Sequence, residues 1–500
     1  MTPTLQPTAQ DDLVAQRDLT DAALTARLRE RTAGKHVYTY AGPRVVISIN
    51  PYDWDASRPL YAASTAAAYR RAPEGDLCGG RRSLAPHLYA VAEQARRRRV
   101  TPGRAQSLLV GGESGAGKTE AVKILLRYIC ESGSGVPRSV GGGTASIVER
   151  LVEMNPLLEA CGNAATSLNH NSSRFGKLIT LHFTHDNPTL DSPITGGVLS
   201  SYLLEKVRVV RHAVGEGSFH IFTQMQNGLD ASELCRLGLT THAEAAAAAR
   251  KIITNTAAAK SASRSLVDAA AWRATNSAAA SVGLQSDEMG RVCELLAACL
   301  HLNEIRFAEM HSRHSEKSRY TSHHMSAGDE GVATIATQSE QRLLAAAALL
   351  GVPADRLAAA VCTRSLRVSG SKLECGRNTS QARASCEALT KQLYSMLFEW
   401  VIQHVNSCIA PSSEEDTEDD RTIALLDLFG FENFEHNSFE QLCINYANES
   451  LQSQFNADVF AAAEAEAKAE GVHLGPADYA DNAACVSLLS SIHPRPGILP

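Results

Sequence analysis

The sequence predicts an α/β fold with a mainly parallel, twisted central sheet, helices on both faces of that sheet, and large helical insertions. Two observations predict it. Strand-like segments alternate with helical segments along most of the 500 residues, which favours a parallel sheet covered by helices. In addition, an apolar run at 108–110 breaks into a glycine-rich turn and then a helical pattern, which is the strand–turn–helix order of such sheets.

The glycine-rich turn, GGESGAGKT at 111–119, fills every position of the phosphate-loop pattern G-x-x-x-x-G-K-T. Its glycines let backbone N–H groups approach nucleotide phosphates, and the start of the following helix favours negative charge. Lys118 supplies a positive charge, and Thr119 supplies a hydroxyl for Mg²⁺. A plain glycine-rich turn before a helix is the alternative. The residues predicted to bind the nucleotide here are Gly112, Glu113, Ser114, Gly115, Ala116, Gly117, Lys118 and Thr119.

The bulk composition is that of a large folded protein with a mild charge. Hydrophobic residues make up 44% of the chain, and the formal net charge is −6, which indicates no polyanion partner. The only dense basic cluster is Arg96–Arg99. Because no aromatic residues are interleaved with it, we expect a solvated helix end rather than a nucleic-acid site.

Cysteine usage and hydropathy favour a cytoplasmic protein. The 12 cysteines form no C-x-x-C pair, and the 17 histidines show no zinc-ligand pattern. The first residues, MTPTLQPTAQDDL, have neither a basic region nor an apolar core of a secretory signal. No apolar run reaches the roughly 18 residues of a membrane span. We therefore expect reduced thiols and no membrane span.

Before the phosphate loop, the pattern predicts a helical region and a hairpin. Residues 1–10 are expected to be disordered, and 11–31 to form an amphipathic helical region with Leu13, Leu19, Leu24 and Leu28 as candidate core positions. HVYTY and RVVISINPY flank a Gly-Pro turn, which predicts a hairpin that ends at Asn50-Pro51. Residues 61–100 are expected to be helical, with a break at 73–80.

After the phosphate loop, helices dominate the pattern. We expect a flexible Ser/Gly-rich loop at 132–143, a helix at 146–161, strands at 177–183 and 196–211, and a helix at 217–229. Residues 230–400 are mostly helical, apart from a His/Ser-rich loop at 309–327 and short strand character at 364–377. An acidic stretch at 414–420 is expected to be a solvated loop. A buried strand at 422–426 and a long helix from about Ser438 complete the order.

Two polar stretches have the chemistry that nucleotide hydrolysis needs besides a phosphate loop. Hydrolysis requires a group that positions water and charge that stabilises the transition state. The first stretch, NHNSSRFG at 169–176, offers adjacent hydroxyls and a guanidinium. The second, DLFGFE at 427–432, offers a carboxylate at a strand end, where Asp427 would hold Mg²⁺ directly or through water. A hydrogen-bonding turn and a simple strand boundary are the respective alternatives.

Taken together, these motifs resemble those of the myosin motor domain. GESGAGKT, NxNSSRFGK and the D-x-x-GFE after an apolar strand are similar to that family's phosphate loop, switch I and switch II. Further stretches that resemble the family are NPY (50–52), PHLYAVA (86–92), NPLLEACGNA (155–164), SYLLEKVRVV (201–210), FHIF (219–222) and NSFEQLCINYANESLQSQFN (437–456). The resemblance implies a P-loop NTPase fold and covers roughly residues 11–500.

The resemblance implies a role for each matching residue. Thr119 and Ser173 would coordinate Mg²⁺, and Asp427 would act through the metal's waters. Asn169 would lie near the α- and β-phosphates, and the adenine pocket would use Asn50, Pro51, Tyr52 and Tyr61. The attacking water would be positioned by Ser114, Ser172 and Gly430, and a gated salt bridge would join Arg174 to Glu432. The helix from Ser438 resembles the relay helix, although its apolar stripe equally suits a core helix.

The resemblance also implies an ATP-driven, cytoskeletal, actin-based motor. Residues 11–500 would be a partial motor, comprising the nucleotide-binding core, the upper actin-binding subdomain and the start of the lower one. The converter, neck and tail would be absent, together with a strand next to the phosphate-loop strand; light chains or calmodulin would bind only a downstream neck. A truncated fragment that binds nucleotide or actin without turnover is the alternative.

Ser371 matches a surface-loop position where family members carry an acidic or phosphorylatable residue. SSRFG and GFE differ from the SSRSH and GSE of a kinesin-like motor.

Overall fold

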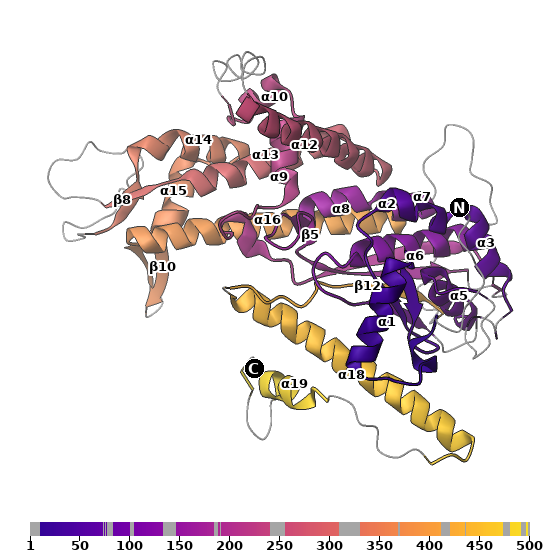
Figure 1. The fold of residues 1–500 in the computed structure, drawn as a ribbon. Helices are drawn as coiled ribbons and strands as arrows, with labels where there is room; N and C mark the ends of the chain where they lie inside the picture. Colours follow the sequence, from indigo (N-terminus) through magenta and orange to yellow (C-terminus); the bar gives the residue numbers. More distant parts are fainter. Residues whose placement is uncertain are drawn as a thin grey trace.

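A computed structural model shows a four-stranded sheet surrounded by helices, with a helical extension on one side and one long helix below it (Figure 1). The structure describes residues 11–500 except 74, 76, 78–83, 101–104, 134–146, 185–188, 191, 241–255, 310–330, 369–370, 412–420, 436, 474–480, 492–496 and 499–500. The expected disordered start, the acidic stretch at 414–420, and nearly all of the loops at 132–143 and 309–327 lie outside the described residues.

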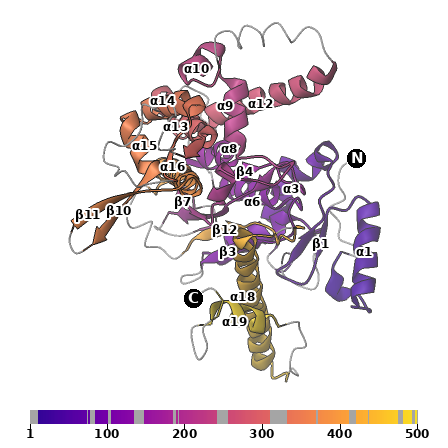
Figure 2. The same cartoon turned by 90° about the vertical axis from the view of Figure 1, so that its left-hand side faces the viewer.

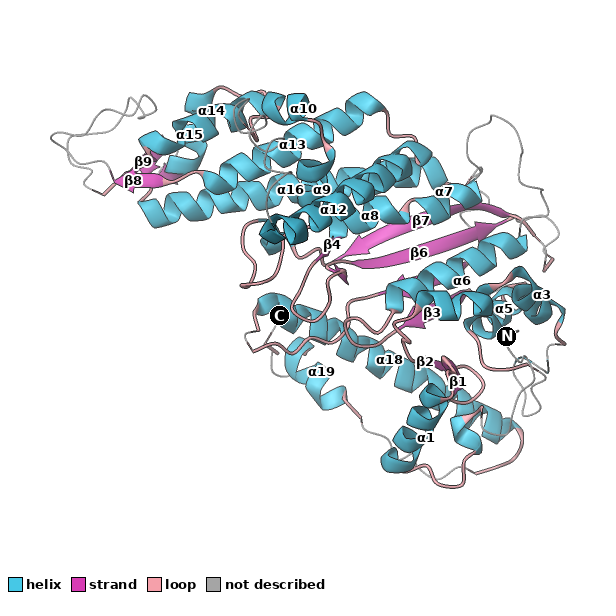
Figure 3. Ribbon diagram, turned by 45° about the horizontal axis from the view of Figure 1, so that its top comes forward, coloured by secondary structure: helices cyan, strands magenta, loops and turns pink. Residues whose placement is uncertain are grey.

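The central sheet has the strand order β3-β12-β6-β7. Its strands are β3 (Gln106–Val110), β12 (Ile423–Asp427), β6 (Gly176–Phe183) and β7 (Ile194–Tyr202). Only β3 and β12 are parallel, whereas β12 pairs antiparallel with β6. The strands β6 and β7 are also antiparallel, as their opposed arrows in Figure 3 show. The prediction of a mainly parallel sheet is therefore wrong for the described strands. The short connection between β6 and β7 permits an antiparallel pair but not a parallel crossover.

Burial differs between the two strands that lead into the predicted site. In β12, Ile423 and Leu425 are fully buried, and Asp427 at its end is 2% exposed. In β3, Leu109 is 42% exposed, because β12 is the only described strand that pairs with β3. The phosphate-loop strand therefore forms an edge of the described sheet.

The N-terminal part packs beside the phosphate-loop helix. The hairpin is confirmed as β1 (Tyr38–Tyr40) paired antiparallel with β2 (Val46–Ser48). The expected helical region at 11–31 begins instead with η1 (Leu13–Ala15), and the helix α1 follows at Asp21–Ala33, because the Thr20 hydroxyl caps its N-terminus. Leu13 is buried, but Leu19 is 56% exposed and is not a core position. The remaining elements are α2 (Trp54–Ser57), η2 (Arg58–Tyr61), α3 (Ala63–Arg71), α5 (Leu88–Arg98) and α6 (Lys118–Gly133).

In the basic run at the end of α5, Arg96 and Arg99 are buried rather than solvated, and Arg97 and Arg98 are partly buried. Arg96 is 3% exposed, and its Nε lies 3.0 Å from the fully buried carboxylate of Glu93. Arg97 Nε lies 2.8 Å from the other oxygen of Glu93, and the Tyr128 hydroxyl also donates to this carboxylate. The expectation of a solvated helix end is therefore wrong for Arg96 and Arg97, because both pair with one buried carboxylate three and four residues earlier.

The helical insertions form the extension on the left of Figure 1. The expected helix at 146–161 is two helices, α7 (Ile147–Glu153) and α8 (Asn155–Gly162), and the strand expected at 196–211 ends at Tyr202. Further elements are β4 (Asn163–Ala164), β5 (Ser172–Ser173), η3 (Lys206–Val209), α9 (His220–Gly228), α10 (Ala231–Arg236), α12 (Thr256–Ser281), α13 (Ser286–Glu304), β8 (Phe307–Glu309), β9 (Ala333–Ile335), η4 (Thr337–Ser339), α14 (Glu340–Leu349), α15 (Ala354–Cys362), β10 (Thr363–Val368), β11 (Ser371–Gly376) and α16 (Thr379–Ile409).

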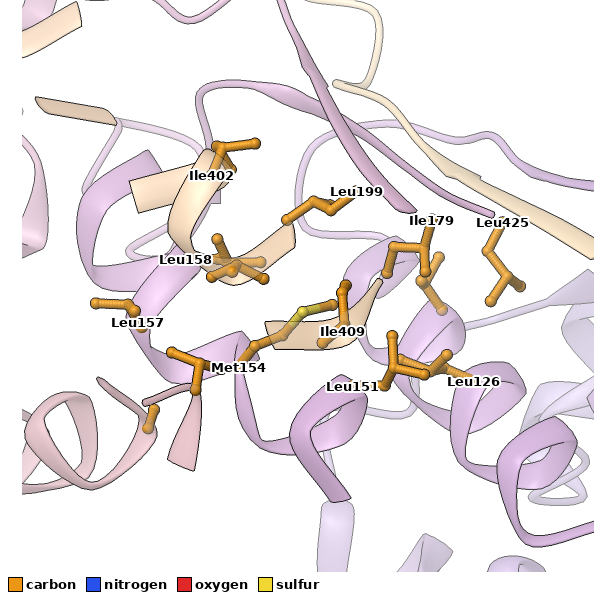
Figure 4. Packing of buried hydrophobic residues seen from close by; sticks show 14 of the residues in the cluster. Leu126, Leu151, Met154, Leu157, Leu158, Ile179, Leu199, Ile402, Ile409 and Leu425 are labelled. Atoms are coloured by element: carbon orange, nitrogen blue, oxygen red, sulfur yellow. The ribbon is translucent and has the colours of Figure 1, made fainter. Parts of the chain in front are cut away.

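One main core joins the sheet to the helices that cover it. Side chains from α6, α7, α8 and α16 meet those of β6, β7 and β12, as Figure 4 shows for Leu126, Leu151, Leu158, Ile179 and Leu425. A second buried cluster lies between α13, α14, α15 and the start of α16. Because α16 contributes to both clusters, it links the extension rigidly to the sheet.

The long helix α18 (Phe439–Ala469) projects away from this core, and α19 (Ala483–Ser490) lies beside it (Figure 2). Its predicted start is confirmed, because Ser438 is the N-cap and forms a capping box with Gln441. Ile444 is buried, but Phe439 is 66% exposed and Phe455 is 37% exposed. In the described structure the apolar stripe of α18 is therefore not that of a core helix.

Among the described residues, no helix taken singly combines the length and the apolar character of a membrane span. The bent pair Thr337–Leu349 and Ala354–Cys362 satisfies these criteria only when its two helices are counted together.

Candidate nucleotide site

The phosphate loop turns between β3 and α6, and its backbone shows why the turn needs glycine. Gly115 and Gly117 have φ angles of +82° and +92°, which side-chain-bearing residues rarely adopt. The Lys118 ammonium donates to the carbonyl oxygens of Gly112 and Glu113, at 2.9 and 2.7 Å. Burial lowers the pKa of Lys118, and the negative charges of Asp427, Glu432 and Glu113 oppose that shift. The loop thus presents a cation and backbone amides at one point.

The stretch Asn169–Gly176, called the serine loop below, lies opposite the phosphate loop across one cavity. Asn169 and Asn171 bond each other reciprocally: the Asn171 N–H donates to Asn169 Oδ1 at 3.0 Å, and Asn169 Nδ2 donates to the Asn171 carbonyl at 3.2 Å. Asn171 Oδ1 also accepts from Asn163 Nδ2 at 3.0 Å and lies 3.1 Å from His220 Nε2. Asn163 and His220 were not predicted as site residues. They lie in quoted motifs, NPLLEACGNA and FHIF, but only the fold brings them to this loop.

Three oxygen-bearing side chains come together where Mg²⁺ was predicted. Thr119 Oγ1 donates to Asp427 Oδ2 at 3.1 Å, and Lys177 Nζ lies 3.4 Å from the same oxygen. Ser173 lines one cavity together with Thr119 and Asp427, and its hydroxyl donates to the Phe175 carbonyl at 3.0 Å. Two hydroxyls and a carboxylate are hard oxygen donors, so the chemistry of this set fits Mg²⁺. The role of Lys177 as a partner of Asp427 was not predicted.

The residues predicted to position water also lie together. The hydroxyl oxygens of Ser114 and Ser172 are 3.4 Å apart, one from each loop. Gly430 approaches the phosphate loop so closely that a Cβ atom there would lie 2.5 Å from the Gly112 carbonyl oxygen and 2.7 Å from the Ser114 nitrogen. Only glycine fits this approach, because a side chain would collide with the backbone of the opposite loop.

The predicted salt bridge closes the back of this cavity. Arg174 NH1 and NH2 donate to Glu432 Oε1 and Oε2, at 2.5 and 3.0 Å, in a two-point contact. Arg174 is fully buried, and Glu432 is 2% exposed. Burial by itself would lower the pKa of Arg174, but its hydrogen bonds to Glu432 and the charges of Glu205 and Glu432 raise it above its ordinary value. Arg174 therefore remains charged.

Each side of this salt bridge has an additional support that was not predicted. Arg174 Nε donates to Glu205 Oε2 at 2.6 Å. On the other side, Asn445 of α18 holds both backbone groups of Glu432, with distances of 2.9 and 2.8 Å, and Gln441 Nε2 donates to Glu432 Oε2 at 3.2 Å. A charged residue within the apolar stretch SYLLEKV was a usable signal for Glu205. The Asn445 contact has no comparable signal in the sequence.

Two adjoining cavities have the size and lining of a nucleotide site. One of about 310 Å³ lies between the three loops, and its wall includes Ser114, Lys118, Thr119, Asn169, Ser172, Ser173, Asp427, Gly430 and Glu432. A second, of about 320 Å³, contains Pro51, Tyr61 and Ala116 in its wall. Asn50, Tyr52, Gly117 and Glu120 line both cavities. Their shared wall makes the pair suitable for a base at one end and phosphates at the other.

The predicted adenine residues are anchored to the phosphate loop. Asn50 Nδ2 donates to the Gly115 carbonyl at 2.9 Å, and Asn50 Oδ1 accepts from the Tyr52 N–H at 3.0 Å. Tyr52 has a φ of +51° and is 83% exposed. Tyr61 lies deeper, with its hydroxyl 2.7 Å from that of Tyr38. Burial raises the pKa of Tyr61, so both phenols are neutral.

Three predicted residues lie apart from these cavities. Gly112 and Glu113 line a different cavity of about 360 Å³ between β3 and α18. Ser371 begins β11 and pairs with Val368 of β10, in a hairpin that projects from the far end of the extension (Figure 2). The structure therefore separates Ser371 from the nucleotide site.

Comparisons with known proteins agree with this arrangement. The family profile described as "Myosin head (motor domain)" matches residues 10–500. Unconventional myosin-Ic of Rattus norvegicus is 34% identical over 475 residues, which are 95% of this chain and 41% of that protein. Myosin-3 of Arabidopsis thaliana is 33% identical over 479 residues (96% and 37%), and unconventional myosin-Ia of Mus musculus is 32% identical over 496 residues (99% and 43%).

The chain spans about two-fifths of the length of these curated relatives. The match extends over nearly all of the chain and includes the three loops around the cavity, and the family implies the P-loop NTPase fold that they form. The chain therefore belongs to the myosin head (motor domain) family.

Proposed function

We propose that this chain is the ATP-hydrolysing part of an actin-based motor. One observation supports this most strongly: a buried two-point pair joins Arg174 of the serine loop to Glu432 of the stretch 427–432, called the acidic loop below. This pair lies directly behind the cavity that the phosphate loop lines. A site that only binds nucleotide has no need of such a pair. A pair that forms only when two loops meet couples the chemistry to movement.

The nucleotide is held by groups that the fold brings together. Lys118 and the amides of residues 112–119 bind the β- and γ-phosphates, and Asn169 lies beside the phosphates. Asn50, Pro51, Tyr52 and Tyr61 surround the adenine. Thr119 and Ser173 would coordinate Mg²⁺, with Asp427 acting through water molecules. When bound, Mg²⁺ would neutralise charge on the β- and γ-phosphate oxygens.

Hydrolysis then requires an ordered water molecule and a closed site. Ser114, Ser172 and Gly430 surround the position from which water attacks, with the backbone N–H of Gly430 available as a donor. Arg174 and Glu432 close the wall behind this water and exclude bulk solvent. Phosphoryl transfer depends on such positioning and electrostatic stabilisation rather than on a covalent nucleophile.

Family membership supports actin filaments as the partner and the cytoplasmic cytoskeleton as the location. Light chains or calmodulin would bind only a downstream neck. Ser371, on the projecting hairpin, remains a predicted regulatory position: Ser371→Glu should change the actin-activated ATPase rate relative to Ser371→Ala, and equal rates would reject it. A fragment that binds nucleotide or actin without turnover is the second candidate.

The salt bridge provides the test. We expect Arg174→Ala and Glu432→Ala each to lower single-turnover phosphate formation by about a hundredfold or more, because each removes a positioned charge from the reacting site. The affinity for a fluorescent ATP analogue should stay within about threefold, because the phosphate loop is unchanged. Arg236→Ala is the matched control, since it breaks the half-exposed Arg236–Glu294 pair and should leave both measurements unchanged.

Either variant hydrolysing ATP at the normal rate would contradict the proposed mechanism. An unaltered chain that binds the analogue but forms no phosphate would favour the non-hydrolysing fragment.

A further inference from the structure

Arg174 has two carboxylate partners, and they contact different edges of its guanidinium. Glu432 contacts the edge formed by NH1 and NH2, whereas Glu205 Oε2 accepts from Nε at 2.6 Å. Both carboxylates are buried, with Glu205 8% and Glu432 2% exposed. Contact at Nε fixes the plane of the guanidinium and turns its NH1/NH2 edge toward Glu432.

Glu205 belongs to the same rigid part of the protein as Arg174. The Glu205 N–H donates to the Arg174 carbonyl at 2.9 Å, and the Arg174 N–H donates to the Gly162 carbonyl at 2.8 Å. Glu205 also accepts from Arg208 Nε at 2.7 Å. This segment follows β7 directly, so the position of Glu205 is set by the central sheet.

Two further charges complete a balanced group. Arg208 NH1 lies 3.0 Å from Glu216 Oε2, and Glu216 Oε1 accepts from the Ser167 N–H at 3.2 Å. Two arginines (Arg174 and Arg208) are therefore matched by two carboxylates (Glu205 and Glu216) without any contribution from Glu432. The positive charge of Arg174 stays compensated even if Glu432 moves away.

Glu432 is attached to a different element. Its backbone is held by Asn445 and its carboxylate by Gln441, both on α18. Figure 2 shows α18 projecting from the core, so Glu432 is held by an element that packs separately from the one that holds Arg174.

We propose that Glu205 is a positioning residue that makes the Arg174–Glu432 pair reversible. It acts as the permanent counter-charge of Arg174 and keeps the guanidinium aimed at Glu432 when the pair is open. A buried charge that loses its only partner is strongly destabilising. With Glu205 in place, opening the pair does not leave a buried, uncompensated arginine, so α18 can separate from the serine loop at little cost.

The role of Glu205 during turnover rests on the proposed ATPase activity, but the first test of this role does not require hydrolysis. Chemical unfolding of the full chain would be measured for Glu205→Gln, Glu432→Gln and the double variant. Each single variant leaves Arg174 one carboxylate, whereas the double variant leaves none. We expect the double variant to lower the folding equilibrium constant at least about tenfold more than the product of the single effects.

Glu216→Gln is the matched control, because Glu216 contacts Arg208 but not Arg174. Combined with Glu432→Gln, it should give the product of the single effects. If Glu205 were purely structural, its substitution and that of Glu432 would lower the folding equilibrium constant by the product of their single effects. That result would overturn the proposal. If Glu205→Gln alone fails to fold, Arg174→Met would be added to the Glu205→Gln/Glu432→Gln double variant, in which Arg174 has no carboxylate partner. This third substitution should restore folding by removing the uncompensated charge, and failure to restore it would also overturn the proposal.

Kinetics provide a second readout if the unaltered chain hydrolyses ATP. In Glu205→Gln, the Gln oxygen can still accept from Nε, so the first turnover should stay within about threefold of normal. Steady-state turnover should fall at least about fivefold, because the pair reopens more slowly. An unchanged steady-state rate, or a first turnover as slow as in Glu432→Gln, would contradict the proposal. Absence of hydrolysis in the unaltered chain would reject the proposed function, while the unfolding test would still decide the role of Glu205.

Discussion

The helices α16 and α18 have the same length, 31 residues, but the protein uses them in opposite ways. Eleven residues of α16 are buried, including Tyr394, Leu397 and Phe398, and they join both hydrophobic clusters. In the described part of α18 only Gln441 and Ile444 are buried. Equal length therefore does not mean equal stability, because most helical stability in proteins comes from packing of an apolar face.

Each helix supports one half of the Arg174–Glu432 pair. Phe398 of α16 packs edge-on against Phe175, the residue after Arg174, with ring centroids 5.0 Å apart. Asn445 of α18 holds Glu432. The arginine thus lies beside the more extensively packed of these two helices, and the glutamate is held by the less packed one. Moving elements are drawn from the regions of low local stability, and α18 has that character.

The largest expected difference concerns hydrogen exchange. Amides in the middle of α16, around 394–405, should exchange only through global unfolding. Amides of α18 beyond residue 450 should exchange on the order of a thousandfold faster, because opening them exposes little buried surface. Native-state exchange followed by mass spectrometry checks this. Similar protection in the two helices would show that the comparison is wrong.

A matched pair of phenylalanine substitutions should give the next largest effect. Phe398→Ala should lower the free energy of unfolding by about 3–5 kcal/mol, because it leaves a cavity in the core beside Phe175. Phe455→Ala, at a 37% exposed position of α18, should cost less than about 1 kcal/mol. Urea titration of both variants measures the contrast. Costs that agree within error would remove the distinction between a core helix and a projecting helix.

The smallest effect compares the two N-caps, since each helix begins with a capping box, from Asn378 to Gln381 and from Ser438 to Gln441. Either alanine substitution of the cap removes about 1 kcal/mol of local stability. For Asn378→Ala this loss should appear in global unfolding, because α16 melts only with the core. For Ser438→Ala it should appear as several-fold faster exchange in the first turns of α18. An equal loss of global stability in both variants would contradict this expectation.

The sequence was informative where the chemistry lies within short stretches. The phosphate loop, Asn169–Gly176 and Asp427–Glu432 each carry a recognisable local pattern, and the fold brings all three around one cavity. The start of α18 was also predictable, because Ser438 and Gln441 are the two ends of a capping box.

Relations that depend on chain direction or distant contacts were not predictable in the same way. Strand patterns at 177–183 and 196–211 do not reveal whether the strands run parallel or antiparallel. The sheet was therefore predicted to be mainly parallel, although two of its three described strand pairs are antiparallel. Similarly, the run Arg96–Arg99 has the composition of a solvated surface, and only the buried carboxylate of Glu93 shows otherwise. Glu205 was missed because its partner, Arg174, lies 31 residues away along the chain.

The exposed edge of β3 also affects how this chain behaves in solution. Its backbone N–H and C=O groups on the side away from β12 face no described strand, and Leu109 beside them is 42% exposed. Such an edge is a template for intermolecular strand pairing, which leads to self-association. The apparent molar mass measured by light scattering should therefore increase with protein concentration, and Leu109→Lys should reduce that increase by adding charge to the edge. The same strand that carries the phosphate loop would thus set the concentration limit for handling this protein.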